Sequence, residues 1–230
     1  MSRFIKYHMH YNLFVLYTVI TGESVVHIGS GIPMPNCSHE EADTRMIVHL
    51  YHALAQGAKT IKVHTVDTDV IVILVGKYHH ILTNYPQTDI WVAFGKGDYF
   101  CLKSISTICT TLGEDMSKAL PIFHALTGCD TTSTFFGKGK KSAWKAWKAY
   151  KDVTNAFLFL AQNPFQQLDK DSEVFKKIER FTVLTYSLKS SLSSVNEARL
   201  TLFCQNSQTM ERLPPTQVRQ IMDHKFKIPL

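Results

Sequence analysis

The chain has 230 residues, 45% of them hydrophobic and 11% aromatic, which is enough to bury the core of one large domain or two small ones. Lys and Arg number 25 against 19 Asp and Glu, and the resulting net charge of +6 favours a polyanionic partner without requiring one. The five cysteines form no CxxC pair and no Cys/His pair at zinc spacing, which argues against a zinc finger and favours a reducing, intracellular setting.

Strands followed by a helix are expected in the first quarter of the chain. Apolar runs at 12–20 and 24–28 flank TGES and predict a β-hairpin. Neither these runs nor VIVILV farther on reaches the ~18 residues that a bilayer span requires, so no membrane partner is expected. Ser38 followed by Glu41 forms a capping box, and apolar residues recurring on one face then predict a helix over 39–56 that ends at the next glycine.

Strand signals continue after this helix. TIKVHTV at 60–66 predicts a strand that closes on Asp67 and Asp69. The VIVILVG run at 70–76 is compatible with a strand or a short buried helix, and its periodicity leaves both open. DIWVAFG and DYFCL, within 89–102, flank a Gly-Lys-Gly turn and predict paired strands.

Helices dominate the rest of the sequence. They are predicted at 104–112, 116–126, 141–150, 153–162, 171–188, 196–204 and 216–223, with breaks at Gly, Pro, Asn and Ser. Strands that alternate with helices early, followed by helices alone, predict an α/β sheet flanked by helices and a helical C-terminal extension. Trp144 and Trp147 lie three apart on one predicted helix, and we expect them to cover the core rather than stack on bases.

Acidic residues stand at the ends of three predicted elements. They are Glu40, Glu41 and Asp43 at a helix start, Asp67 and Asp69 past a strand, and Asp130 past a helix. In an open α/β sheet, ligands bind beyond the carboxyl ends of the strands, and carboxylates gathered there repel one another unless a cation lies between them. Oxygen ligands favour Mg²⁺ or Mn²⁺, but a helix cap also explains Glu41 and an ordinary turn explains Asp67 and Asp69. Asp43 is different, because it shares the apolar face of its predicted helix and is expected to need a partner.

The Gly-Lys-Gly-Lys-Lys segment at 137–141 opens a predicted helix. Its spacing fits neither the P-loop nor the dinucleotide-binding glycine pattern. Lys138, Lys140 and Lys141 surround exposed backbone N–H groups, an arrangement that suits a backbone phosphate. A solvated basic turn is the alternative, and both interpretations stay open.

Taken together, EEADTR, VDTDV and TGCDTTSTFFGKGKKSA resemble the flap endonuclease and XPG-like nucleases of the PIN-like superfamily. They look like that family's Glu-Ala-Glu-Ala helix start, its acid-x-acid after a strand, and its Leu-Gly-Cys-Asp followed by a Gly-x-Gly-x-Lys-x-Ala turn. The resemblance covers roughly residues 37–150. HEEADTR, FHALTGCDTTS and VNEARLTLFCQ also resemble a multi-copy group of metazoan proteins found in transposon-rich genomes. Chains of that group are normally longer, so a fragment or a shortened copy is expected.

The resemblance implies a fold and a site. The fold is α/β, with a PIN-like, mostly parallel central sheet in an N-terminally incomplete domain at 1–150, a helix-hairpin turn, and a helical extension at 151–230. The implied metal ligands are Glu41, Asp43, Asp67, Asp69 and Asp130, of which the four aspartates are also catalytic. They would hold Mg²⁺ or Mn²⁺, with two ions if the site is complete. Glu40 takes the place of Glu41 as the metal ligand beside Asp43 if the first turn is helical, because Glu41 and Asp43 are two residues apart and would then lie on different sides of the helix.

The resemblance also implies a partner. Gly137, Lys138, Gly139, Lys140 and Lys141 would hold the backbone of nucleic acid, DNA rather than RNA, and the expected location is intracellular and nuclear. The family additionally uses aspartates from its first strand and the following helix, whereas no Asp precedes Asp43 in this sequence. One metal site therefore lacks half of its ligands. A metal-dependent nuclease, a degenerate module that binds nucleic acid or a protein, and a gene fragment without stable function all remain open.

Overall fold

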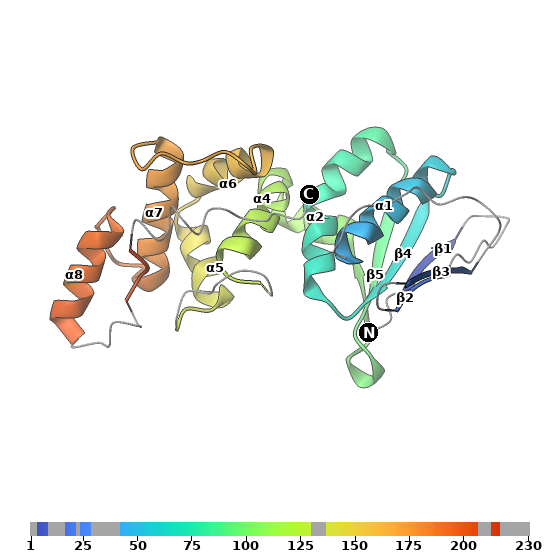
Figure 1. Cartoon of the computed structure of the whole chain (residues 1–230), viewed down its shortest axis with the longest axis horizontal. Coiled ribbons are helices and arrows are strands. Elements are labelled where there is room, and N and C mark those ends of the chain that lie inside the picture. The colour runs from blue at the N-terminus through green and yellow to red at the C-terminus, as the bar shows by residue number, and fades with distance from the viewer. Residues whose placement is uncertain are drawn as a thin grey trace. The chain divides into compact units, whose positions relative to one another are not determined.

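The computed structural model describes residues 42–129, 137–206 and 213–216, of which 42–45 and 205–206 are described by backbone alone (Figure 1). Ahead of them it describes the backbone of β1 (Phe4–His8), β2 (Tyr17–Thr21) and β3 (Ser24–Ile28). The chain divides into two compact units, Met1–Lys118 and Ala119–Ile228, and each is described by itself.

The first unit is an α/β layer. Its further elements are α1 (Ala42–Ala55), β4 (Thr60–Thr65), α2 (Thr68–Asn84), β5 (Asp89–Phe94), the short 3₁₀ turn η1 (Gly97–Tyr99), β6 (Cys101–Ser104) and α3 (Ile105–Leu112). Four strands form a sheet in the order β1-β4-β5-β6. Only β4 and β5 are parallel, while β1 and β6 pair antiparallel with their neighbours.

The expectation of a mostly parallel sheet is therefore wrong for the described strands, whose sheet is mixed. The physical reason lies in the connections between strands. A parallel pair requires a crossover, which α2 supplies between β4 and β5, whereas the short turn after β5 returns the chain directly as an antiparallel strand. β1 has no counterpart among the predicted elements, and it takes the edge position beside β4.

Alternating burial explains β4 and its neighbour. Ile61 and Val63 are buried on one face, and their partners in β5, Ile90 and Val92, continue that buried surface. The VIVILVG segment belongs to α2, not to a strand, and buries Leu74 among other apolar side chains. The predicted hairpin is confirmed by β2 and β3, which pair antiparallel in a separate two-stranded sheet.

The second unit is helical. Its helices are α5 (Lys140–Ala149), α6 (Val153–Gln162), α7 (Glu173–Tyr186) and α8 (Val195–Asn206), and α4 (Glu114–Leu126) runs across the division between the units. The predicted helices up to 204 are thus observed, with ends shifted by a few residues. The one predicted at 216–223 lies outside the described residues apart from its first position. None of the described helices is long and apolar enough to cross a membrane.

Aromatic rings form the centre of this unit. Trp147 is fully buried, stacks on Phe123 with a ring-centroid distance of 4.8 Å, and meets Phe157 edge-on at 5.4 Å. Its indole Nε1 donates to Thr154 Oγ1 at 2.9 Å, so burial leaves no unpaired donor. Trp144 is half-buried beside it, which confirms that both tryptophans cover the core. Because α5 packs on α7, the division between the units falls before the domain boundary expected at residue 150.

Candidate functional site

Asp67 and Asp69 stand where β4 ends and α2 begins. Asp67 has an extended backbone, and its Oδ1 accepts a hydrogen bond from the Asp69 N–H at 2.9 Å, so it is the N-cap of α2. The Asp67 N–H in turn donates to Thr65 Oγ1 at 3.0 Å. Both aspartates are half-buried. The sequence VDTDV therefore has a structural role at this position, because the first carboxylate satisfies a backbone N–H at the helix start.

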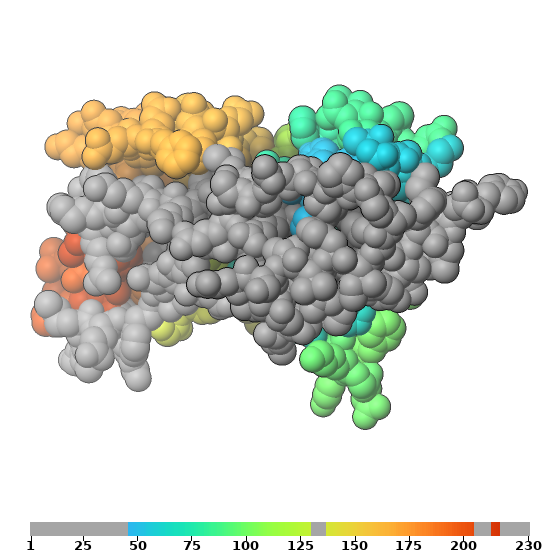
Figure 2. All heavy atoms as spheres, turned by 45° about the vertical axis from the view of Figure 1, so that its right-hand side comes forward, coloured from blue at the N-terminus to red at the C-terminus, as the bar shows by residue number. Residues whose placement is uncertain are grey.

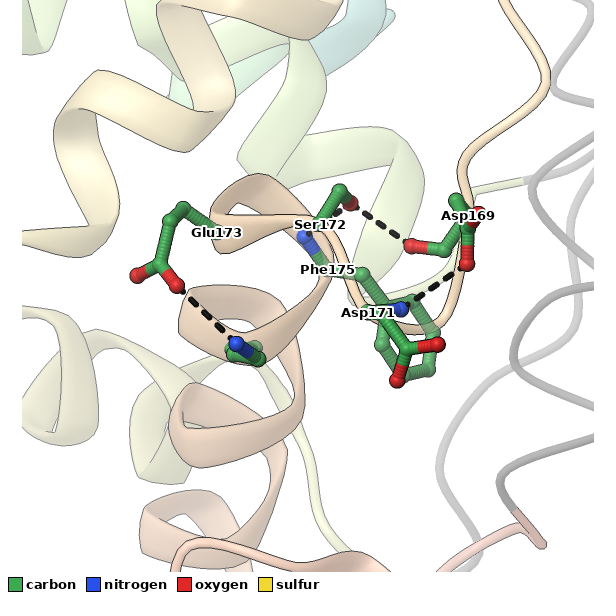
Figure 3. Close-up of polar contacts among 6 residues, drawn as sticks. Asp169, Asp171, Ser172, Glu173 and Phe175 are labelled. Carbon is green, nitrogen blue, oxygen red and sulfur yellow. Dashed lines mark hydrogen bonds and ion pairs between the residues drawn. The ribbon is translucent and has the colours of Figure 1, made fainter.

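The same turn occurs a second time in the chain. Ahead of α7, Asp169 Oδ1 accepts from the Asp171 N–H at 2.9 Å, and Ser172 Oγ then caps the helix by accepting from the Phe175 N–H at 3.2 Å (Figure 3). Glu173 follows in the first turn and pairs with a lysine one turn on. This acid-x-acid sequence is exposed and belongs to no implied metal site. In both acid-x-acid sequences the first carboxylate accepts from the second N–H, but Asp67 is itself the N-cap of α2, whereas Ser172 takes that role for α7.

The acids of α1 are placed only through the backbone. Asp43 is in the first turn of α1, and the turn at 56–59 reverses the chain before β4. The helix and the strand are about equally long, roughly 20 Å each, so the start of α1 and the end of β4 lie at the same edge (Figure 1). The side chain of Asp43 and the whole of Glu40, Glu41 and Asp130 lie outside the described residues. Among the residues that are described, no group of three or more His, Cys, Asp or Glu could hold a metal ion.

Two lysines of the Gly-Lys turn bind the ends of other helices. The Lys140 ammonium donates to the carbonyl oxygens of His124 and Gly128 and to Thr127 Oγ1, at the C-terminal end of α4. Lys138 Nζ donates to the Tyr186 carbonyl oxygen, the last residue of α7, at 3.2 Å. A cation at a helix C-terminus satisfies carbonyls that have no partner within the helix and offsets the helix dipole. The side chains of Lys138 and Lys140 therefore have internal roles.

The glycines of this turn shape the backbone. Gly137 has a φ of +69°, a left-handed conformation that other residues rarely adopt. Gly139 is the N-cap of α5, and no side chain caps this helix start. The first turn of α5 contains lysines and no acid, which is the unfavourable sign for the positive end of a helix dipole.

Lys141 is the first of three exposed lysines that share one face of α5. With Lys145 and Lys148 it follows the i, i+4, i+7 spacing of a single helix face, which we call the basic face. The opposite face carries the buried Ala146 and Trp147. Lys148 Nζ lies 5.9 Å from the Trp144 ring, and none of the three lysines forms an ion pair with a described residue.

Lys145 and Lys148 were not among the predicted binding residues. The sequence did contain a signal for them, because residues 131–151 hold six lysines and no acid. Their spacing within the predicted helix at 141–150 would have placed them on the side of Lys141.

Burial changes the pKa of one tyrosine beside the Gly-Lys turn. It raises the pKa of Tyr186 to about 12, an effect that the charge of Arg199 only partly offsets. The Tyr186 phenol is neutral at physiological pH, as it would be without this shift. Its ring faces the Lys138 ammonium at 5.6 Å, which adds a cation–π contact to the hydrogen bond at its carbonyl.

Asp67 and Asp69 lie in the first compact unit and the basic face lies in the second, and each is a candidate site by itself. Compared with protein-family models, with curated proteins and with solved structures, the chain gives no match.

Proposed function

We propose that this chain binds the phosphodiester backbone of nucleic acid through the basic face of α5. The observation that carries the proposal is the set of three exposed ammonium groups, Lys141, Lys145 and Lys148, on one helix face without an acidic partner among the described residues. At 1.5 Å per residue the face is about 10 Å long, which matches about three phosphates of a strand that rises 3.4 Å per nucleotide.

The start of α5 supports the same partner. A phosphate bound there would accept hydrogen bonds from backbone N–H groups that no side chain caps. Its negative charge would also offset the repulsion between the lysines of the first turn and the positive end of the helix dipole. The resemblance to flap endonuclease-like proteins points to DNA rather than RNA as the partner of this turn. A nuclear location accompanies the proposal for that reason.

The proposal is tested by fluorescence anisotropy with a labelled DNA duplex. The variant Lys141→Gln/Lys145→Gln/Lys148→Gln removes the basic face. A control with the same change of net charge, Lys59→Gln/Lys170→Gln/Lys189→Gln, replaces exposed lysines on other elements.

Each lost phosphate contact should weaken binding roughly tenfold near 0.1 M salt, so the basic-face variant should lose two to three orders of magnitude in affinity. The control should bind nearly as tightly as the wild-type chain. Equal losses in the two variants would reject the proposal, because they would show that only net charge matters.

Metal-dependent hydrolysis of phosphodiesters is the second candidate function. The observation that favours it is the position of Asp67 and Asp69 at the carboxyl end of β4, beside the parallel strand β5 and at the edge where α1 begins. With Asp43 and one of the glutamates ahead of it, these carboxylates would hold Mg²⁺ or Mn²⁺. The ion would supply positive charge to offset the negative charge that develops on the phosphate.

The matched variant for this candidate is Asp67→Asn/Asp69→Asn. Asparagine caps a helix about as well as aspartate, so the start of α2 should persist while the negative charge is removed. Purified protein would be incubated with branched and single-stranded DNA and either Mg²⁺ or Mn²⁺. Cleavage that requires the metal and is lost in the variant supports hydrolysis. No cleavage by the wild-type chain, or undiminished cleavage by the variant, rejects it.

A further inference from the structure

The hairpin that joins β5 to β6 presents aromatic side chains to solvent. It belongs to the first compact unit, whereas the basic face belongs to the second. Tyr99 is 88% exposed, Phe100 47% and Leu102 50%. The hairpin extends beyond the sheet and forms the green projection at the lower edge of the space-filling view (Figure 2). Neighbouring large apolar side chains at such a tip are unfavourable in water and are typical of a surface that contacts a partner.

One glycine and two backbone hydrogen bonds shape the backbone of this tip. Gly95 has a φ of +88°, and a Cβ added there would lie 2.4 Å from the Tyr99 carbonyl oxygen. The Tyr99 N–H donates to the Lys96 carbonyl oxygen at 3.2 Å, and the Phe100 N–H donates to that of Gly97 at 3.1 Å. The two rings are therefore presented by a tight, hydrogen-bonded turn, which lowers the entropy lost when they bind a partner.

Cations accompany the rings. Phe100 stacks on His64, with ring centroids 6.3 Å apart and planes inclined by 27°. Lys96 is exposed beside Tyr99, and Lys103 lies on the following strand with its Nζ 5.8 Å from the Phe94 ring. Between residues 95 and 104 there are two lysines and one acid, Asp98.

We propose that Tyr99 and Phe100 stack on the bases of single-stranded nucleic acid, with Lys96 and Lys103 beside its phosphates. Every base has a π face, so aromatic rings flanked by cations bind single strands with little dependence on sequence. A duplex keeps its bases stacked on one another and offers the tip no such face. This inference rests on the proposed function, because both take nucleic acid as the partner. It differs in assigning base contacts to the hairpin tip, whereas the basic face contacts phosphates.

The test compares an oligothymidine strand with an abasic strand of equal length, which has the same number of phosphates and no bases. The variant Tyr99→Ala removes a ring that is almost fully exposed, so the fold should be unaffected. Phe165→Ala is the matched control, because Phe165 is 87% exposed and lies in the other unit.

Tyr99→Ala should weaken binding of the oligothymidine about fivefold to 100-fold and leave the abasic strand and a DNA duplex unaffected. Phe165→Ala should change none of the three. The inference is overturned if the wild-type chain binds no single strand, if Tyr99→Ala binds oligothymidine as tightly as wild type, or if both single strands weaken equally. Binding of the wild-type chain to anionic vesicles that is lost in Tyr99→Ala, without strand binding, would assign the tip to a lipid surface instead.

The duplex measurement separates this inference from the proposed function. Failure of the basic face would appear as duplex binding that is insensitive to Lys141, Lys145 and Lys148. Failure of the tip would leave that dependence intact.

Discussion

Replacing Lys140 and Lys141 one at a time by methionine should affect two different properties, although the residues are neighbours. The Lys140 ammonium donates to two carbonyl oxygens and a hydroxyl at the end of α4, whereas the Lys141 side chain is exposed. A cation at a helix C-terminus is worth about 0.3–2 kcal/mol, and a hydrogen bond to a charged group about 1.5–3 kcal/mol. Because Lys140 is in contact with water, screening reduces the sum, and we expect Lys140→Met to lower the free energy of unfolding by about 1–2 kcal/mol.

For a chain of this length, that loss corresponds to a melting temperature lower by about 2–8 °C, measured by circular dichroism. Lys141→Met should shift the melting temperature little, since exposed substitutions usually change stability by less than about 0.5 kcal/mol. In duplex binding the order should reverse, with roughly a tenfold loss for Lys141→Met near 0.1 M salt and a small loss for folded Lys140→Met. If Lys140→Met melts like the wild-type chain and binds as weakly as Lys141→Met, the assignment of Lys140 to the end of α4 is wrong.

Three further outcomes follow from local geometry. Gly95→Ala should destabilise the chain more than Gly113→Ala in urea unfolding, because both glycines have positive φ but only a Cβ at Gly95 would meet backbone; equal losses would contradict this. Asp67→Ala should cost about 0.5–2 kcal/mol and Asp67→Asn much less, because only asparagine retains the cap of α2; equal costs would show that capping is unimportant. Since burial raises the pKa of Tyr186 to about 12 in the folded chain, the stability that this shift contributes is fully present below pH 10 and is lost as the pH rises toward 12. Tyr186→Phe should therefore flatten the fall in the free energy of unfolding between pH 10 and pH 12, and the same fall in the variant would show that Tyr186 does not cause it.

Local patterns in the sequence were sufficient to predict most helices and strands, because each depends on periodicity and on caps. The VIVILVG segment was ambiguous since its residues are apolar on all sides, and the need for a crossover between parallel strands makes it a helix. Strand direction was not predictable in the same way. The antiparallel pairing of β1 with β4 joins segments far apart in sequence, and no local pattern specifies such a contact.

The candidate sites, too, could be predicted only in part from the sequence. Asp67-Thr-Asp69 and Asp169-Lys-Asp171 have the same pattern and the same hydrogen bond from the second N–H to the first carboxylate, but only Asp67 caps a helix, so the pattern by itself does not assign a role. Lys140 and Lys141 are identical in type and adjacent, yet the rotation of α5 directs one toward α4 and the other to solvent. That rotation is set by the packing of Trp147 in the aromatic core, a tertiary contact. The helical spacing of the remaining lysines, in contrast, was readable from the sequence.

If three lysines of α5 contact phosphates, the salt dependence of duplex binding must change when they are removed. The logarithm of the binding constant falls with the logarithm of salt concentration, with a slope of about −0.9 for each phosphate contacted. Removing Lys141, Lys145 and Lys148 together should therefore make the slope shallower by about 2.7, while the scattered-lysine control keeps the wild-type slope. Identical slopes for the wild-type chain and the basic-face variant would show that these three lysines do not contact phosphates.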